Sequence, residues 1–338
     1  MLNYVYQLIT PKTISVKYED VEVKNQVIVK PEYLAVCHAD QRYYQGKRDA
    51  KVLRKKLPMA LIHEGWGRVL YDATGTFNIG DKVVMIPNVP GDTQNDIIYE
   101  NYGKGSSFLS SGKDGFMRET VNLNPDRLVR FEGIDERIAA ISEFVSVGMH
   151  AFHRFDVIAH SCKKRIGVWG CGSLAFVVSC ILKKKYPTSK ICVIGRNVNK
   201  LNQFSFADET YLIDDLEDDF EVDHAFECAG GEGSYYAIDD IIRYINPQGS
   251  VVLMGVSENK IPINTRDVLE KGLTFVGCSR SGREDFINAV DFMKDFSVQR
   301  RLKSIIYETE PVKDIADIHR VFSVDMNTDF KTVFKWEV

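Results

Sequence analysis

The segment RIGVWGCGSLA, residues 165–175, decides the fold. Its first five residues predict a short buried strand, and residues 173–186 predict a helix that ends in lysines. The turn between them has the pattern GxGxxA. Gly170 permits a tight turn and Gly172 lets the backbone approach a pyrophosphate, whose charge the helix N-terminus favours. We therefore expect a dinucleotide to bind at Gly170, Gly172, Ser173 and Leu174.

Strands and helices continue to alternate after this turn. Further strands are predicted at residues 191–194, 209–213, 222–228, 250–256 and 273–278, and further helices at residues 197–207 and 234–245. Such alternation is typical of βαβ units and a parallel sheet. We therefore expect an α/β protein in which residues 146–278 form a doubly wound Rossmann domain.

The end of the second predicted strand indicates which dinucleotide binds. NAD-binding domains place an acid there to hold the ribose 2′-hydroxyl. Here Gly195 takes that place and Arg196 follows it. A guanidinium binds a 2′-phosphate, which a carboxylate would repel, and Lys200 adds a second cation. We therefore expect NADP(H), bound in part by Arg196 and Lys200.

The first half of the chain has a different pattern. Short β-like runs are predicted at residues 27–29, 34–36, 67–70 and 82–86, and residues 88–115 form a polar stretch that predicts an extended loop. The tail at residues 331–338 predicts one more strand, which lies outside the alternation. We therefore expect residues 1–145 and 279–338 to form a second, mostly antiparallel domain.

Composition excludes several classes of protein. The 338 residues carry 43 basic and 47 acidic side chains, so the net charge of −4 does not suggest a nucleic-acid binder. No apolar run is long enough to span a membrane, and residues 1–11 do not resemble a secretory signal. The seven cysteines lack CxxC spacing, and six lie in apolar surroundings from residue 162 onward. They predict buried free thiols and a cytoplasmic protein.

Three separated fragments contain residues that coordinate transition metals. Cys37 lies in the segment CHAD, His63 and Glu64 lie in HEGWG, and Glu143 lies in SEFVSVGMHAF. A thiolate, an imidazole and a carboxylate suit Zn²⁺. Spacing across a hundred residues is not diagnostic by itself, and each residue alone is more often structural.

These fragments, followed by GxGxxA, resemble the zinc-dependent medium-chain alcohol and polyol dehydrogenases over nearly the whole chain. The resemblance implies a GroES-like, mostly-β catalytic domain beside the Rossmann domain. It also implies one catalytic zinc, with Cys37, His63, Glu64 and Glu143 at the ligand positions. Asp40 matches the acid that orients the zinc-binding histidine and fixes its tautomer.

Four protein ligands would close a zinc site, whereas a catalytic zinc keeps an open position. We therefore expect one carboxylate, that of Glu64, to move away when water or substrate binds. The resemblance has two departures. The stretch at residues 88–115 has no cysteine, so we expect no structural zinc. Ala39 replaces the usual hydroxyl residue of the proton relay, which leaves water, Glu64 or Tyr44 as alternatives.

The substrate is indicated by a basic stretch after CHAD. Its seven cations are Arg42, Lys47, Arg48, Lys51, Arg54, Lys55 and Lys56. They form either a solvated basic loop or a field that attracts an anionic substrate. Within the family, the motifs most resemble the branch that reduces D-ribulose 5-phosphate to D-ribitol 5-phosphate for CDP-ribitol, a precursor of teichoic acids and capsules. That resemblance implies a phosphorylated ketose or polyol as substrate, and a homodimer formed through residues 273–278. A complex with a cytidylyltransferase is a further hypothesis.

Two alternatives stay open at this point. An NAD-dependent dehydrogenase of an unphosphorylated polyol, of the sorbitol or xylitol type, would need an acid near Gly195, which is absent. A non-catalytic dinucleotide-binding relative would be free to lose its metal ligands. The presence of Cys37, His63, Asp40 and Glu143 together argues for an enzyme.

Overall fold

A computed structural model describes residues 2–21, 23–95 and 97–338. The chain forms two compact units. Unit 1 comprises residues 1–146 and 280–338, and unit 2 comprises residues 147–279. These limits differ by one residue from the expected domain boundaries. Among the described residues, no helix combines the length and the apolar character needed to cross a bilayer.

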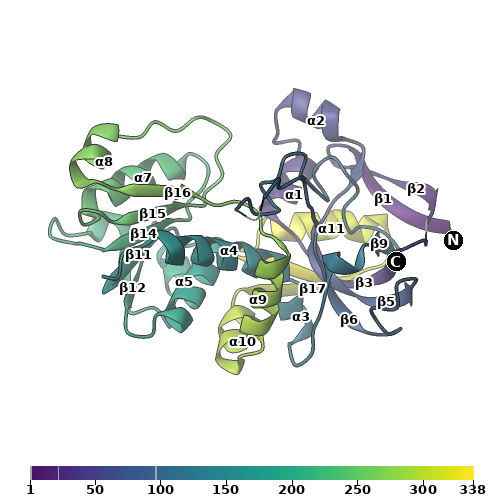
Figure 1. Cartoon of the computed structure of the whole chain (residues 1–338). Coiled ribbons are helices and arrows are strands. Elements are labelled where there is room, and N and C mark those ends of the chain that lie inside the picture. Colours follow the sequence, from purple (N-terminus) through teal and green to yellow (C-terminus); the bar gives the residue numbers. More distant parts are fainter. Residues whose placement is uncertain (1, 22, 96) are drawn as a thin grey trace. The chain divides into compact units, whose positions relative to one another are not determined.

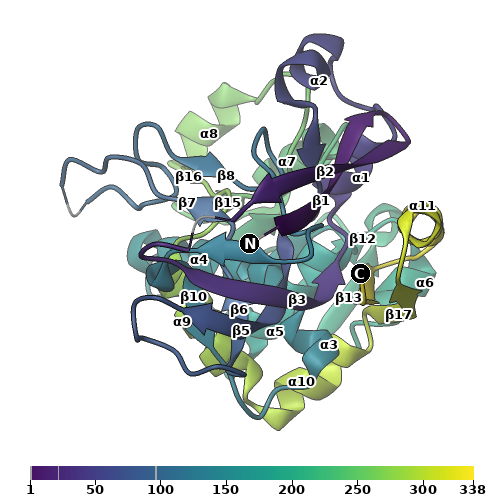
Figure 2. The ribbon, with the colours of Figure 1, turned by 90° about the vertical axis from the view of Figure 1, so that its right-hand side faces the viewer.

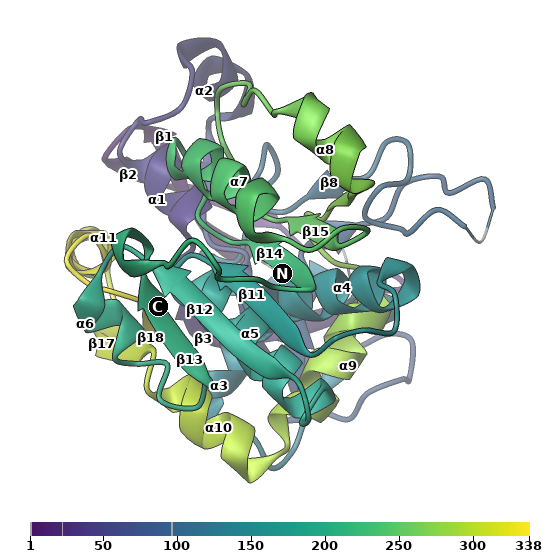
Figure 3. The same cartoon turned by 90° about the vertical axis from the view of Figure 1, so that its left-hand side faces the viewer.

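Unit 2 contains a six-stranded parallel sheet with the order β13-β12-β11-β14-β15-β16. Its strands are β11 (Arg165–Trp169), β12 (Lys190–Gly195), β13 (Glu209–Leu212), β14 (His224–Glu227), β15 (Ser250–Leu253) and β16 (Thr274–Gly277). Figure 3 shows β11 to β15 side by side. This order reverses direction between β11 and β14, which is the place where doubly wound sheets bind ligands. The expected Rossmann fold is confirmed.

The helices of unit 2 largely follow the sequence prediction. They are α5 (Ser173–Lys185), α6 (Val198–Leu201), α7 (Gly233–Tyr244) and α8 (Thr265–Lys271). The expected helix over residues 197–207 was wrong in length, because the chain turns after Leu201. Phe204 and Phe206 then pack their rings against Phe176 of α5, which an extended α6 would not allow.

Unit 1 is mostly β-structure. Its strands are β1 (Leu2–Thr10), β2 (Thr13–Asp20), β3 (Val27–Ala35), β4 (Met59–Ala60), β5 (Glu64–Asp72), β6 (Lys82–Met85), β7 (Asn88–Val89), β8 (Ser107–Phe108), β9 (Val121–Leu123), β10 (Leu128–Arg130), β17 (Ile306–Val312) and β18 (Lys331–Trp336). The main sheet has the order β10-β6-β5-β3-β18-β17. Figure 2 faces this unit. The C-terminal strand β18 thus joins the N-terminal half, pairing antiparallel with β3.

Two details of unit 1 differ from expectation. The runs at residues 27–29 and 34–36 belong to one strand, β3, whose register with β5 shifts between Pro31 and Tyr33. A proline cannot donate a ladder hydrogen bond, so an irregularity at this point lets the strand continue. Strands β1 and β2 form a further hairpin that was not anticipated.

The remaining helices of unit 1 are short, apart from α4, which continues into unit 2. They are α1 (His38–Tyr44), α2 (Ala50–Lys56), α3 (Glu136–Ala139), α4 (Ser142–Ile158), α9 (Arg283–Met293), α10 (Phe296–Lys303) and α11 (Ile315–Asp325), with single 3₁₀ turns at Pro125–Arg127 and, in unit 2, at Ile213–Asp215 (Figure 1). The basic stretch expected as a loop is therefore helical in α1 and α2. Asp49 accounts for α2, because its side chain caps the helix N-terminus.

The cysteines are all free thiols. The expectation that the six from residue 162 onward are buried was wrong for two of them. Cys162 is exposed and Cys171 is only half-buried, whereas Cys180, Cys192, Cys228 and Cys278 are buried.

Candidate metal centre and dinucleotide site

Strand pairing assembles the candidate metal centre in unit 1. Ala35, the last residue of β3, lies opposite Glu64, the first residue of β5. Cys37 therefore stands just beyond the end of one strand, and His63 stands just before the start of its neighbour. Glu143 joins them from the first turn of α4. The register of one strand pair thus brings Cys37 close to His63, and α4 adds a residue from more than a hundred positions after Cys37.

The ligand-type atoms of this cluster lie close together. Those of Cys37, Asp40 and His63 are all within 4.8 Å of one another, as are those of His63, Glu64 and Glu143. His63 Nδ1 lies 3.1 Å from Asp40 Oδ2. That contact leaves the other ring nitrogen, Nε2, for a metal, and it gives Asp40 the orienting position that the sequence suggested.

A buried lysine that the sequence analysis missed completes the cluster. Lys331 Nζ lies 2.7 Å from Glu64 Oε1 and donates a second hydrogen bond to the carbonyl of Val36. The side chains of Lys331 and Glu64 are 5% and 0% exposed, so each charge depends on the other. The only sequence signal was a lysine at the start of a strand, KTVFKW, that is apolar at three of its other positions.

Asp40 is held by three groups. Besides the contact with His63, it accepts hydrogen bonds from the hydroxyl of Ser110 and from the backbone N–H of Ile62, the latter at 3.1 Å. The side chain is fully buried. Burial alone would raise the pKa of Asp40, but the neighbouring His63, followed by these two donors, holds it below its usual value. Ser110 is thus a second supporting residue that the sequence did not reveal.

The charges of the cluster are unbalanced without a cation. Burial raises the pKa of the Cys37 thiol, although His63 opposes the shift. Burial also raises the pKa of Glu143 to about 7. For His63, burial acts in the opposite direction, but the charges of Asp40 and Cys37 outweigh it and raise the pKa of the imidazole well above its usual value. Acidic groups outnumber basic ones in a buried place, which a divalent cation would relieve.

The glycine turn of unit 2 has the geometry that a phosphate needs. Gly170 has a φ of +130°, and a Cβ there would lie 2.8 Å from the carbonyl oxygen of Cys228. Gly172 precedes α5, and a Cβ there would meet nothing within 4 Å. Open space at this backbone leaves room for a pyrophosphate at the helix N-terminus. Ser173 and Leu174, the first residues of α5, are half-buried beside it.

The structure explains why no acid stands at the end of β12. A Cβ on Gly195 would lie 2.6 Å from the Cβ of Cys171, so only glycine fits against the turn. The next residue, Arg196, is exposed, and its guanidinium approaches Gly233 at the start of α7. Lys200 lies in α6, where Asn197 caps its backbone N–H. Two cations thus flank the end of this strand.

Glu227, at the end of β14, organises the loop that follows. Its buried carboxylate accepts hydrogen bonds from the backbone N–H groups of Ala229, Gly230 and Gly255, and from the hydroxyl of Ser234. Such a carboxylate fixes the loops after two neighbouring strands on the side where the glycine turn lies. The sequence analysis did not single this residue out.

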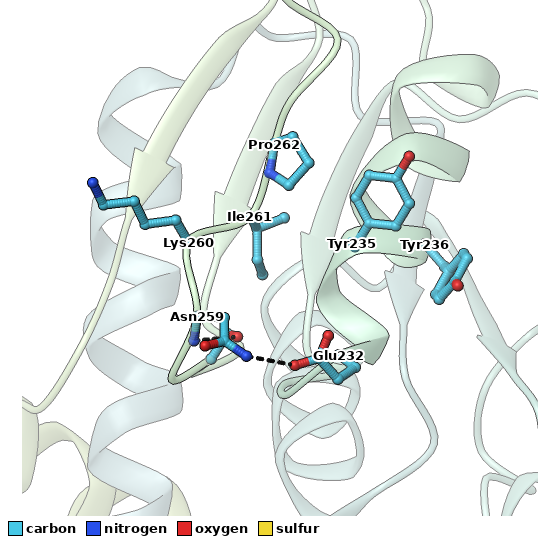
Figure 4. A pocket seen from close by; sticks show the side chains of 8 residues that line it. Glu232, Tyr235, Tyr236, Asn259, Lys260, Ile261 and Pro262 are labelled. Carbon is cyan, nitrogen blue, oxygen red and sulfur yellow. Dashed lines mark hydrogen bonds between the residues drawn. The ribbon is translucent and has the colours of Figure 1, made fainter. Parts of the chain in front are cut away.

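Unit 2 also has a surface hollow of about 420 Å³ apart from the glycine turn (Figure 4). Its lining residues are Glu232, Tyr235, Tyr236, Ser257, Asn259, Lys260, Ile261 and Pro262. A hydrogen bond of 3.0 Å joins Asn259 to Glu232 across it. None of the expected cofactor-binding residues lines this hollow.

Two family models match the chain. The model of the alcohol dehydrogenase GroES-like domain matches residues 23–133, and the model of the zinc-binding dehydrogenases matches residues 201–295. Together they cover more than half of the sequence. The chain belongs to the zinc-dependent medium-chain dehydrogenase family. The expected GroES-like and Rossmann architecture is therefore confirmed.

Relatives in this family match most or all of the chain. A ribulose-5-phosphate reductase of Streptococcus pneumoniae is 57% identical and covers 100% of this chain and 98% of its own. The crystal structure of S. aureus TarJ in complex with NADPH is 42% identical with a TM-score of 0.89, and both chains are covered completely. Sorbitol dehydrogenase 2 of Saccharomyces cerevisiae is 24% identical over 84% of this chain and 86% of its own.

The cluster in unit 1 fits the metal of this family. Its donors are a thiol, an imidazole and two carboxyl groups, which is the ligand set that Zn²⁺ accepts. Glu64 Oε2 is buried and has no hydrogen-bond partner, so a lone pair is free for a cation. A buried acceptor without a partner is costly, and a metal ligand would remove that cost.

Proposed function

We propose that this protein reduces D-ribulose 5-phosphate to D-ribitol 5-phosphate with NADPH, and that the product supplies CDP-ribitol for teichoic acid or capsule synthesis. One observation carries the proposal. A ribulose-5-phosphate reductase matches 100% of the chain at 57% identity, so the metal cluster and the glycine turn fall within the matched sequence. The substrate is then a small phosphorylated ketose.

In the proposed reaction, Cys37, His63 and Glu143 bind the zinc and Asp40 orients the His63 ring. When bound, zinc acts as a Lewis acid toward the C2 ketone. Glu64 would offer its partnerless Oε2 as a further zinc ligand, while Lys331 holds its Oε1 at 2.7 Å. Because a catalytic zinc needs an open position, Glu64 would be the ligand that gives way to the substrate.

The nicotinamide supplies the hydride, and unit 2 holds the rest of the cofactor. Gly170, Gly172, Ser173 and Leu174 hold the pyrophosphate at the N-terminus of α5, while Arg196 and Lys200 bind the 2′-phosphate. A guanidinium can donate two parallel hydrogen bonds to a phosphate, which favours NADPH over NADH. The exposed position of Arg196 suits a ligand that arrives from solvent.

The reduced C2 oxygen must take up a proton, and Ala39 cannot donate one. Water, Glu64 and Tyr44 are the remaining candidates. The hydroxyl of Tyr44 lies 2.7 Å from His319 Nδ1, so this pair is able to exchange a proton. Burial raises the pKa of the Tyr44 hydroxyl, which keeps its proton in place at neutral pH.

An NADPH-consumption assay across ketoses tests the proposal. We expect D-ribulose 5-phosphate to be reduced at a much higher kcat/KM than D-ribulose, D-xylulose or D-fructose, and NADPH to be preferred over NADH. Equal turnover of unphosphorylated ketoses with NADH would instead support a polyol dehydrogenase of the sorbitol type, and no turnover would support a non-catalytic relative.

The quaternary structure and partners are also proposals. We propose a homodimer formed through β16, because this strand lies at one end of the sheet and an unpaired edge favours association. A measured mass of about twice 38.4 kDa would support it, and a monomer would contradict it. Free cysteines suit a cytoplasmic location, where a complex with a cytidylyltransferase is testable by co-purification.

A further inference from the structure

The basic stretch after CHAD does not act as one surface. Four of its seven cations, Lys47, Lys51, Arg54 and Lys55, are exposed to solvent. Arg48 and Lys56 are half-buried, and both lie against the ring of Tyr43. We propose that Arg48 and Lys56, together with the hydroxyl of Ser111, bind the phosphate of the substrate. This inference rests on the proposed function and names the residues that make the enzyme selective for a phosphorylated ketose.

Tyr43 brings the two cations together. Its ring is buried, with the Arg48 guanidinium carbon 4.7 Å and Lys56 Nζ 5.7 Å from the ring centroid. An aromatic face attracts a cation and holds its stem, which lowers the entropy lost when an anion binds. Two cations eight positions apart in the sequence therefore lie against the same ring.

Lys56 is also poised to accept an anion. Its Nζ donates a hydrogen bond of 2.7 Å to Ser111 Oγ, and it forms no ion pair with any carboxylate of residues 2–21, 23–95 and 97–338. Asp49, the acid within the basic stretch, accepts hydrogen bonds from the backbone N–H groups of Lys51 and Val52. The Asp49 carboxylate thus caps the N-terminus of α2.

This group of residues adjoins the metal cluster at two points. Tyr43 follows Asp40 by one turn of α1, and Ser111 directly follows Ser110, whose hydroxyl donates to Asp40. Asp40 in turn contacts the ring of His63. In the proposed arrangement, the carbonyl of the substrate faces the metal cluster and its phosphate faces Arg48 and Lys56.

Another cation of unit 1 is the competing candidate. The Arg280 guanidinium carbon lies 5.8 Å from the centroid of the Phe108 ring, whose edge packs against the ring of His63. Arg280 therefore adjoins the metal cluster itself. A residue there would contact the reacting end of the substrate, whereas Arg48 and Lys56 reach its far end.

The test compares Lys56→Gln and Arg48→Gln with Lys55→Gln in the zinc-loaded protein. Lys55 is the matched control, because it carries the same charge next to Lys56 but is exposed. With NADPH, we expect each of the first two variants to raise KM for D-ribulose 5-phosphate about 10- to 100-fold, the effect of losing one charge-assisted hydrogen bond. For D-ribulose, the kcat/KM of both variants should stay within about twofold of the wild-type value. The Lys55→Gln variant should keep wild-type kcat/KM within about twofold for both substrates.

A second measurement uses inorganic phosphate as the probe. Phosphate should inhibit the reduction of D-ribulose 5-phosphate competitively in the wild type and in Lys55→Gln, and only weakly in Lys56→Gln and Arg48→Gln. Equal losses for both substrates, the same effect from Lys55→Gln, or selectivity lost only in Arg280→Gln would overturn the inference. A wild type that does not favour the phosphorylated ketose would overturn the proposed function, and the inference with it.

Discussion

The dinucleotide turn of unit 2 comes from consecutive residues, Gly170 to Leu174, whereas the metal cluster of unit 1 draws on separated segments that end at Lys331. The turn depends on its own backbone, since a φ of +130° at Gly170 sets its shape. The cluster depends on the pairing of β3 with β5 and β18. A contiguous site is therefore robust to changes elsewhere, and a dispersed site needs the whole sheet of unit 1.

The largest expected effect separates the two sites by function. Cys37→Ser or His63→Ala removes a zinc ligand, so the rate should fall on the order of 1,000-fold, as expected when several kcal/mol of Lewis-acid stabilisation is lost. NADPH should still bind within about twofold of wild type, because unit 2 is unchanged. A turnover assay measures the loss of rate, and fluorescence titration with NADPH measures the retained affinity. Full activity in zinc-free Cys37→Ser protein would refute the role of the cluster.

The next effect concerns the buried ion pair. Lys331→Met leaves Glu64 buried without its partner, so the metal-free protein should lose about 3–5 kcal/mol of unfolding free energy. Lys335→Met, on the same strand, is the matched control, because the Lys335 side chain is 41% exposed and its pair with Glu337 lies at the surface. It should change stability little. Urea unfolding of both variants measures the two changes in unfolding free energy. Equally small losses would show that Lys331 does not offset the buried charge of Glu64.

The third effect is a dependence on pH. Burial raises the pKa of Glu143 to about 7, so the folded metal-free chain binds more protons than the unfolded chain between the usual carboxyl pKa of 4.5 and that value. Stability therefore falls as pH rises through this window. Glu143→Gln should raise the stability of the metal-free protein at pH 8 by on the order of 2–3 kcal/mol and should also abolish zinc binding. Thermal unfolding of the metal-free wild type and variant at pH 5 and pH 8 measures this difference in stability. A variant that is less stable than the wild type at pH 8 would contradict the claim that the cluster carries excess negative charge.

The smallest effect tests the turn. Gly170→Ala places a Cβ 2.8 Å from the carbonyl oxygen of Cys228, and should cost about 1–3 kcal/mol of stability. Gly172→Ala meets nothing and has an ordinary φ of −90°, so it should spare the fold but obstruct the pyrophosphate. Unfolding curves and NADPH titration separate the two outcomes. Identical behaviour of both variants would mean that the glycines do not have distinct roles.

The elements that short stretches of consecutive residues encode were predicted correctly from the sequence. The parallel sheet of unit 2 was predicted nearly strand by strand, because each βα pair repeats the same short pattern of apolar strand and amphipathic helix. The position of Arg196 followed from that register. Cys37, His63 and Glu143 were identified through family resemblance, and the structure brings them together.

The misses share a physical cause. Lys331 contacts Glu64 across 267 positions, and no spacing rule connects a C-terminal strand to that glutamate. The same holds for Ser110, whose partner Asp40 lies on another element. Helix α2 was missed because seven cations suggested a solvated loop, although Asp49 was a usable cap signal.

X-ray absorption at the zinc edge tests the central claim most directly, namely that the dispersed cluster of unit 1 holds a single catalytic zinc. The account predicts about one zinc per chain, with one sulfur donor at roughly 2.3 Å and the remaining donors nitrogen or oxygen at roughly 2.0–2.2 Å. Cys37→Ser should remove the sulfur contribution. A zinc with no sulfur neighbour, or one with several, would contradict the assignment.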